Sequence, residues 1–150
     1  MFFSIFNWFC AGIVVLILIP NLLYALRHPG GGLSSGSRTI NLLEQIGRYG
    51  CMIFMVVPLG VKGGGLGFAS AEGLVLWAAG TALLLLSYYV CWIFYARRRG
   101  RRLAIALAVL PCGIFLLSAI LLRHWVLAVF TGIFTVSHLY IVLHSAPTDA

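Results

Sequence analysis

The chain has 150 residues, of which 62% are hydrophobic and only 9% are charged. A soluble domain keeps about a quarter of its residues charged, so the composition excludes a water-facing surface and indicates one polytopic membrane domain over residues 1–150. The formal net charge is +7, but the aromatic residues are not interleaved with the main basic run at 97–102. We therefore expect no nucleic-acid binding.

A membrane-spanning helix needs about 20 mostly apolar residues. Five stretches come near this length, at residues 2–26, 42–61, 74–96, 103–122 and 125–144. The second stretch carries charges, and the fourth is separated from the fifth only by Arg123 and His124. We predict an all-α bundle of five transmembrane helices in a lipid bilayer.

The segments between the apolar stretches differ in character. Residues 28–37 and 62–73 are glycine-rich and are expected to be loops, and the tail at 145–150 is short and polar. This division places Glu72 in the second loop and Asp149 in the tail.

The distribution of basic residues predicts the orientation, because cytoplasmic loops are enriched in Lys and Arg. Five arginines lie within residues 97–102, and Arg27 and Arg38 flank the first loop. The loops on the opposite side hold only Lys62 and Arg123. We therefore predict the N-terminus outside and the C-terminus inside. No basic residue precedes the first apolar stretch, so no cleavable signal peptide is expected.

Polar side chains gather toward the cytoplasmic half of the predicted bundle. Charged groups are costly inside a membrane and usually face the bundle interior or a watery cavity. Helical spacing places the polar residues of each stretch on one face, and we predict that these faces enclose a pocket open to the cytoplasm. The candidate ligand-binding residues are Asn21, Tyr24, Glu44, Arg48, Tyr49, Tyr88 and His138.

The charged candidates also have a purely structural explanation. Asn41 and Glu44 have the spacing of a capping box with Asn41 as the N-cap. Glu44 and Arg48 are four residues apart, in the order that favours an ion pair on a helix. The cluster is equally explained as the start of a helix at the membrane interface.

His138 and Asn21 leave a similar choice open. The imidazole of His138 is either a proton-binding or ligand-binding group, since histidine titrates near neutrality, or a hydrogen-bonding link between helices. Asn21 follows Pro20, which frees a carbonyl one turn earlier, so its amide either repairs a kink or contacts a ligand at a helix break. A haem needs a second histidine at the same depth, and the spans place none there, so no cofactor is expected.

The motifs of metal sites and of metal-dependent membrane enzymes are absent from the sequence. The cysteines at 10, 51, 91 and 112 form no C-x-x-C, so we expect neither a zinc site nor a thiol-redox site. There is no H-E-x-x-H motif, and only three residues are acidic. A protein without enzymatic activity is therefore favoured, and no catalytic residue is predicted.

Three segments carry a resemblance to known sequences. They are residues 41–51 (NLLEQIGRYGC), 20–25 (PNLLYA) and 137–141 (SHLYI). Together they resemble a group of small uncharacterised multi-pass proteins of bacterial plasma membranes. The resemblance implies a bacterial plasma-membrane location and implies no activity.

Three functions fit these residues. We favour a proton-linked binder or transporter of a small solute, with Arg48 as the counter-charge and Glu44 or His138 as the protonatable group. A five-span protomer is small for a transporter, so a homodimer is expected. The second function is a structural or accessory subunit without a ligand, in which the polar residues only join helices. The third is an enzyme on a lipid-like substrate, with Glu44 or His138 as general base and Arg48 holding a phosphate or carboxylate.

Overall fold

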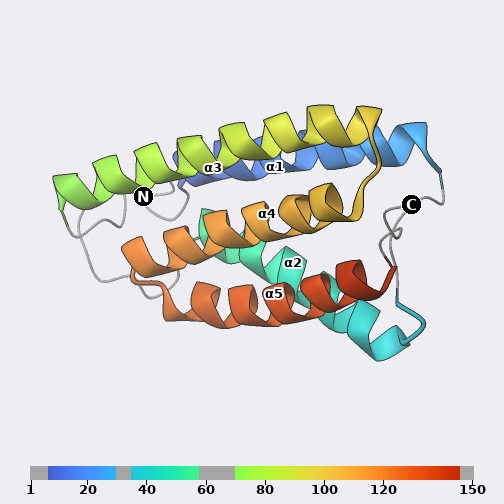
Figure 1. Cartoon of the computed structure of the whole chain (residues 1–150). Coiled ribbons are helices and arrows are strands. Elements are labelled where there is room, and N and C mark those ends of the chain that lie inside the picture. The colour runs from blue at the N-terminus through green and yellow to red at the C-terminus, as the bar shows by residue number, and fades with distance from the viewer. Residues whose placement is uncertain (1–6, 30–34, 58–69, 146–150) are drawn as a thin grey trace.

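The computed structural model describes residues 7–29, 35–57 and 70–145 (Figure 1). Its regular elements are all helices: α1 (Trp8–Arg27), α2 (Arg38–Val56), α3 (Ala71–Arg97), α4 (Arg101–Leu121) and α5 (Trp125–Ser145). The predicted all-α architecture is confirmed. Residues 2–6 and 58–61 of the predicted stretches, Lys62 and Asp149 lie outside the described residues.

Four of the helices, α1, α3, α4 and α5, are long and apolar enough to cross a membrane. Helix α2 has 19 residues but carries Arg38, Glu44 and Arg48, and it does not belong to this group. Four candidate spans among the described residues indicate a membrane protein.

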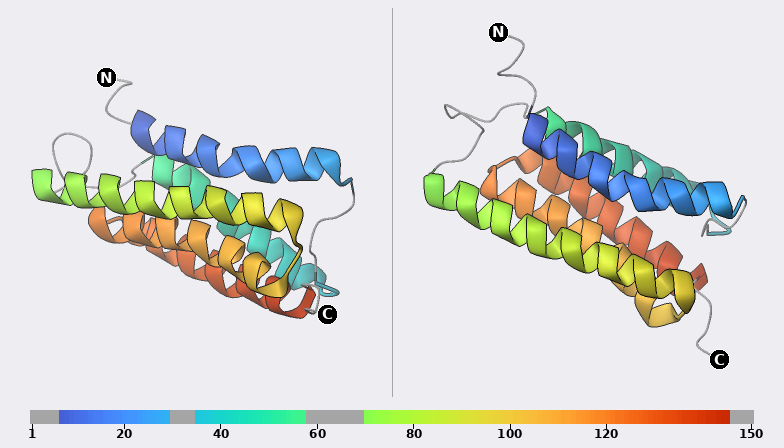
Figure 2. Two further views of the ribbon diagram at one scale, coloured as in Figure 1. Left: turned by 45° about the horizontal axis from the view of Figure 1, so that its top comes forward. Right: turned by 90° about the horizontal axis from the view of Figure 1, so that it is seen from above.

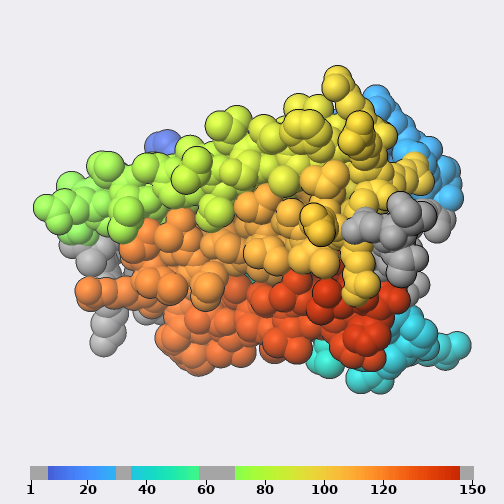
Figure 3. Space-filling model, in the orientation of Figure 1, coloured from blue at the N-terminus to red at the C-terminus, as the bar shows by residue number. Residues whose placement is uncertain are grey.

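Helix α4 occupies the centre of the bundle. It lies between α3 and α5, and the three helices run side by side across one face of the molecule (Figures 1 and 3). Helix α2 lies along α5, while α1 touches α2 and α3 more sparingly at the edge of the bundle (Figure 2). Lipid is as apolar as a helix surface, so close fit and polar contacts, more than the hydrophobic effect, must hold these helices together.

Helices α2 and α5 come close together at a glycine. A Cβ atom on Gly47 would lie 2.7 Å from the backbone nitrogen and Cα of Phe134, a distance that only a glycine permits. Four residues further along α2, about 6 Å at a rise of about 1.5 Å per residue, the Sγ of Cys51 lies 3.6 Å from the Oγ1 of Thr131 on α5. These contacts fix an antiparallel register between the two helices.

Two helices begin earlier than the sequence indicated. Helix α2 starts at Arg38 with Ser37 as its N-cap residue, so the predicted capping box with Asn41 is wrong. Asn41 lies inside the helix, and its side-chain amide bonds the backbone nitrogen and carbonyl of Ser35 at 2.9 and 2.8 Å. Helix α3 starts at Ala71, which places Glu72 in its first turn rather than in a loop. The reason is a nearer cap, because the hydroxyl of Ser70 accepts from the amide of Gly73 at 3.1 Å.

The turn between α4 and α5 is fixed by its backbone and by one buried imidazole. Arg123 has a left-handed φ of 51° and the amide of His124 donates to the carbonyl of Ala119 at 2.9 Å. The ring of His124 is only 1% exposed, and its Nδ1 accepts from the amide of Leu127 at 3.1 Å, which caps the first turn of α5. Burial lowers the pKa of His124 below its ordinary value, because the charged ring would lose its hydration.

Candidate functional site

Glu44 is the centre of the most polar contact between helices. It faces α5 from the second turn of α2 and is only 5% exposed. Its Oε1 accepts from the guanidinium of Arg48 and from Nδ1 of His138, the latter at 3.0 Å. The close approach at Gly47 lies one turn away and brings α5 near enough for this contact. We call Glu44, Arg48 and His138 the charged triad.

The ring of His138 is held in one orientation. Phe134, one turn earlier on α5, stacks on it with ring centroids 4.8 Å apart and an interplanar angle of 23°. An ionised carboxylate only accepts hydrogen bonds, so Nδ1 of His138 carries the hydrogen that Glu44 receives. In the described part of the chain, no group bonds Nε2 of His138 or Oε2 of Glu44, so each keeps hydrogen-bonding capacity.

Arg48 is less enclosed than its partner. Its side chain is 43% exposed and that of Glu44 is 7% exposed. A guanidinium has five N–H donors in a planar fork. Within the described ranges, Arg48 uses this fork to donate a hydrogen bond to Glu44 alone. Arg48 therefore remains able to bind an anionic group without giving up the ion pair.

A second polar contact joins α1 to α3. The side-chain nitrogen of Asn21 donates to the hydroxyl of Tyr88 at 2.9 Å and to the carbonyl of Ile17 at 3.1 Å. The hydroxyl of Tyr88, whose side chain is 1% exposed, also reaches the carbonyl of Ile17 at 3.3 Å. The amide of Asn21 therefore bonds both its own helix, at Ile17, and the neighbouring α3, at Tyr88.

Tyr89, which is not among the predicted site residues, replaces the hydrogen bond that Pro20 removes from α1. Pro20 has no amide hydrogen, so the carbonyl of Leu16 loses its normal helical donor. The hydroxyl of Tyr89 donates to that carbonyl at 2.7 Å. The proline was the available signal, because it marks Leu16 as an acceptor, but the sequence does not say which helix supplies the donor.

The remaining two candidates lie apart from both contacts. Tyr24 belongs to an aromatic group near the end of α1, where its ring stacks on His28 at 4.7 Å and packs against Trp92 at 5.3 Å. Tyr49 is 59% exposed on α2 and does not join the others. The seven predicted residues therefore form the charged triad, the Asn21–Tyr88 contact and a separate aromatic group, with Tyr49 outside them.

No group of three or more His, Cys, Asp and Glu side chains in the described ranges is arranged to hold a metal ion. No protein-family model, curated protein or solved structure matches the chain. The function is therefore inferred from the chain's own residues.

Proposed function

We propose that the protein is a five-span protein of a bacterial plasma membrane, with its N-terminus outside and its C-terminus inside. Three features support α2 as the fifth span. It lies along α5 from Glu44 to Cys51, and its end is joined to the start of α1 by the amide of Asn7, which donates to the carbonyl of Val56 at 2.8 Å. Glu44 and Arg48 pair with each other, which lowers the cost of placing them in a membrane, and Arg38 lies at the very start of the helix.

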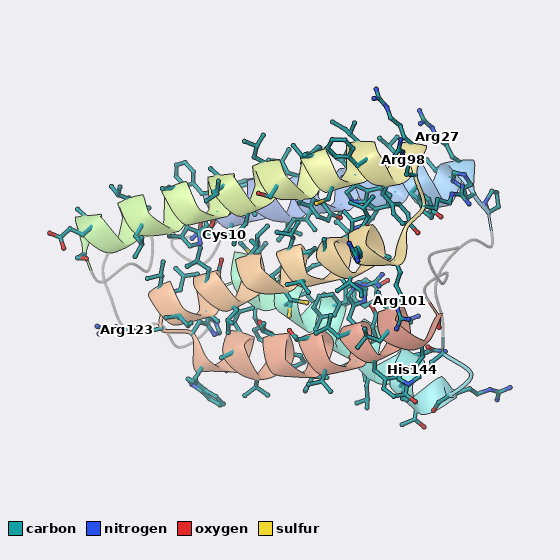
Figure 4. All side chains as sticks on the ribbon, in the orientation of Figure 1. Cys10, Arg27, Arg98, Arg101, Arg123 and His144 are labelled. Atoms are coloured by element: carbon teal, nitrogen blue, oxygen red, sulfur yellow. The ribbon has the colours of Figure 1, made fainter. Side chains whose placement is uncertain are left out.

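The orientation rests on the separation of charges. Arg27, Arg98 and Arg101 lie at the end of the bundle where α1 and α3 end, and Arg123 lies at the other end (Figure 4). The basic end belongs on the cytoplasmic side under the positive-inside rule.

Within this arrangement the protein binds a small solute at the charged triad and moves it across the membrane with a proton, acting as a homodimer. The observation that carries this proposal is the incomplete pairing of the triad: Oε1 of Glu44 receives both contacts, while Oε2 of Glu44 and Nε2 of His138 keep their capacity. Polar groups buried between helices usually have a hydrogen-bond partner, so these two atoms are available to a ligand. Their position beside the exposed guanidinium of Arg48 favours a ligand-binding role for the charged triad.

The net charge of the charged triad links solute binding to proton binding. Glu44 and Arg48 cancel each other, so the triad is neutral when His138 is neutral and carries one positive charge when His138 is protonated. An anionic solute is attracted to the protonated form, and binding it restores neutrality. A proton and an anion bound together reach the far side without moving net charge.

A second candidate function is an accessory subunit in which the triad only holds α2 against α5. The position of the Glu44–His138 contact, one turn from the close approach at Gly47, favours this alternative. The two functions differ in what an Arg48 substitution does, since the contact between helices is made by His138 and not by Arg48.

The test is uptake by sealed vesicles that contain the purified protein, measured with a panel of labelled small carboxylates and amino acids under an inward proton gradient. We expect the wild type to accumulate at least one of them and Arg48→Ala to abolish uptake while its thermal unfolding stays near that of the wild type. Arg123→Gln, which removes a charge at the opposite end, is the matched control and should retain uptake. Undiminished uptake by Arg48→Ala would overturn the proposal, and failure of the wild type to accumulate any member of the panel would favour the accessory subunit.

A further inference from the structure

One end of the bundle carries most of the basic residues that the structure describes. Its basic residues are Arg27, Arg38, Arg97, Arg98, Arg99, Arg101 and Arg102. Among the described residues the carboxylates lie elsewhere: Glu44 is paired with Arg48, and Glu72 opens α3 at the other end. Clustered positive charges create a positive electrostatic potential, so this end attracts anions.

One of these arginines is held in place by α1. The guanidinium of Arg99, in the turn between α3 and α4, donates to Nε2 of His28 and lies 5.9 Å above the ring of Tyr24. The other ring nitrogen of His28, Nδ1, lies 3.3 Å from the carbonyl of Tyr24 and donates to it. Nε2 of His28 accepts from Arg99, and an imidazole gives a guanidinium no counter-charge. Arg99 is positioned by two aromatic rings but is not neutralised by them.

We propose that the end of α1 and the turn between α3 and α4 bind the phosphate headgroup of an anionic phospholipid, with Arg98 and Arg99 contacting the phosphate and His28 positioning Arg99. The site lies at the ends of three candidate spans, which is the depth of the headgroup layer. Tyr24, Trp92 and Tyr95 gather beside it, and aromatic rings are enriched at this level of a membrane. Arginine forms paired hydrogen bonds with phosphate oxygens.

A bound headgroup also has a structural consequence for α1. This helix touches the rest of the bundle sparingly, and its last turn is joined to the turn between α3 and α4 through Arg99. A phosphate that neutralises Arg99 removes the repulsion between that turn and Arg27. The lipid therefore secures the end of α1 to the bundle.

The test is native mass spectrometry of the full-length protein released from bilayers with equal amounts of phosphatidylglycerol and phosphatidylcholine. We expect the wild type to retain phosphatidylglycerol preferentially. A basic side chain that contacts the headgroup strengthens this attraction by about fivefold, so Arg99→Gln, which removes a contact, should lower the retained ratio by about that factor. His28→Gln should lower it less, because it keeps the charge of Arg99 and removes only its positioning.

Two control variants distinguish a defined phosphate site from a general electrostatic attraction to the basic end of the bundle. Arg38→Gln removes one charge from the same end, at the start of α2, and should lower the ratio less than Arg99→Gln does. Arg123→Gln removes one charge from the opposite end and should retain the wild-type ratio. An equal loss in Arg38→Gln and Arg99→Gln would overturn the site. If Arg99→Gln does not fold, hydrogen exchange in the last turn of wild-type α1 decides the question. That exchange should be slower in phosphatidylglycerol than in phosphatidylcholine, and equal rates would contradict the proposal.

A further arm distinguishes a lipid from a soluble anion. Inorganic phosphate added to the protein in detergent should leave its thermal unfolding temperature unchanged, whereas phosphatidylglycerol should raise it. An equal rise with inorganic phosphate would show a site for a free anion and would overturn the lipid proposal.

Discussion

The interface between α2 and α5 and the interface between α1 and α3 are held together in different ways. The first combines a charged contact, Glu44 to His138, with a backbone approach that only glycine permits at Gly47. The second depends on two tyrosine hydroxyls that reach backbone carbonyls beside Pro20. Helices α2 and α5 are therefore joined in one register, whereas α1 is attached where Pro20 interrupts the hydrogen bonding of its own helix.

Of the substitutions that test the two interfaces, Gly47→Ala is expected to have the largest effect. The new methyl group would lie 2.7 Å from the backbone of Phe134, and since backbone cannot rotate away, α2 and α5 must separate. Overpacking of this kind costs about 3 kcal/mol. Reversible unfolding in mixed micelles should detect the loss, and Gly132→Ala, where nothing lies within 4 Å of the new Cβ, should be nearly neutral. Equal stability of the two variants would contradict a close approach at Gly47.

A smaller effect is expected from breaking the charged contact across the same interface. Glu44→Gln and His138→Gln should each destabilise the protein, and the double variant should cost less than their sum. Hydrogen bonds between membrane helices contribute about 1 kcal/mol, so we expect a coupling free energy near that value from a double-mutant cycle. Coupling indistinguishable from zero would mean that the two side chains do not interact.

The interface between α1 and α3 can be tested through its proline. Tyr89→Phe removes the hydroxyl that serves the carbonyl of Leu16 and should cost about 0.6 kcal/mol. Pro20→Ala restores the amide hydrogen that the carbonyl lacks. In the Pro20→Ala background, Tyr89→Phe should therefore cost less than in the wild type, as measured by the same unfolding assay. The same cost in both backgrounds would show that the hydroxyl serves another purpose.

The weakest effect at neutral pH concerns the turn that joins α4 to α5. The pKa of His124 is lowered by burial, so the unfolded chain binds a proton that the folded protein rejects. The resulting stability is present above the ordinary histidine value of about 6.5 and is lost as the pH falls below it. Protonation also blocks the hydrogen bond that Nδ1 accepts from Leu127.

The matched variant for this turn is His124→Asn, which keeps a capping acceptor and does not titrate. The difference in unfolding free energy between wild type and variant should shift in favour of the variant between pH 7.5 and pH 5. A difference that stays constant over this range would rule out a neutral, buried His124.

Much of the fold was predictable from the sequence, because long apolar stretches and the basic run already mark the helices and their ends. Helix starts were less so: Asn41 has capping chemistry, but Ser37 occupies the N-cap position. The pairing of Glu44 with Arg48 followed from their spacing on one helix. The contacts between different helices could not be predicted. Position along a helix gives the depth of a residue in the membrane, but it does not show which neighbouring helix the side chain faces.

Tyr49 illustrates the same limit within the candidate site. It shares a depth with Glu44 and Arg48, but it is one residue beyond Arg48 and so lies about 100° around the helix, where it is 59% exposed. Tyr89 was not predicted because its partner is not a side chain. Its hydroxyl acts on a backbone carbonyl, and side-chain patterns do not show backbone partners.

The proposal that the charged triad binds an anionic solute with a proton is tested most directly by recording proton and solute entry in the same sealed vesicles for the wild type and His138→Gln. We expect wild-type vesicles to take up one proton per solute, with uptake rising as the external pH falls. We expect His138→Gln, still folded, to lose this pH dependence. Unchanged proton uptake per solute and unchanged pH dependence in His138→Gln would contradict the proposal.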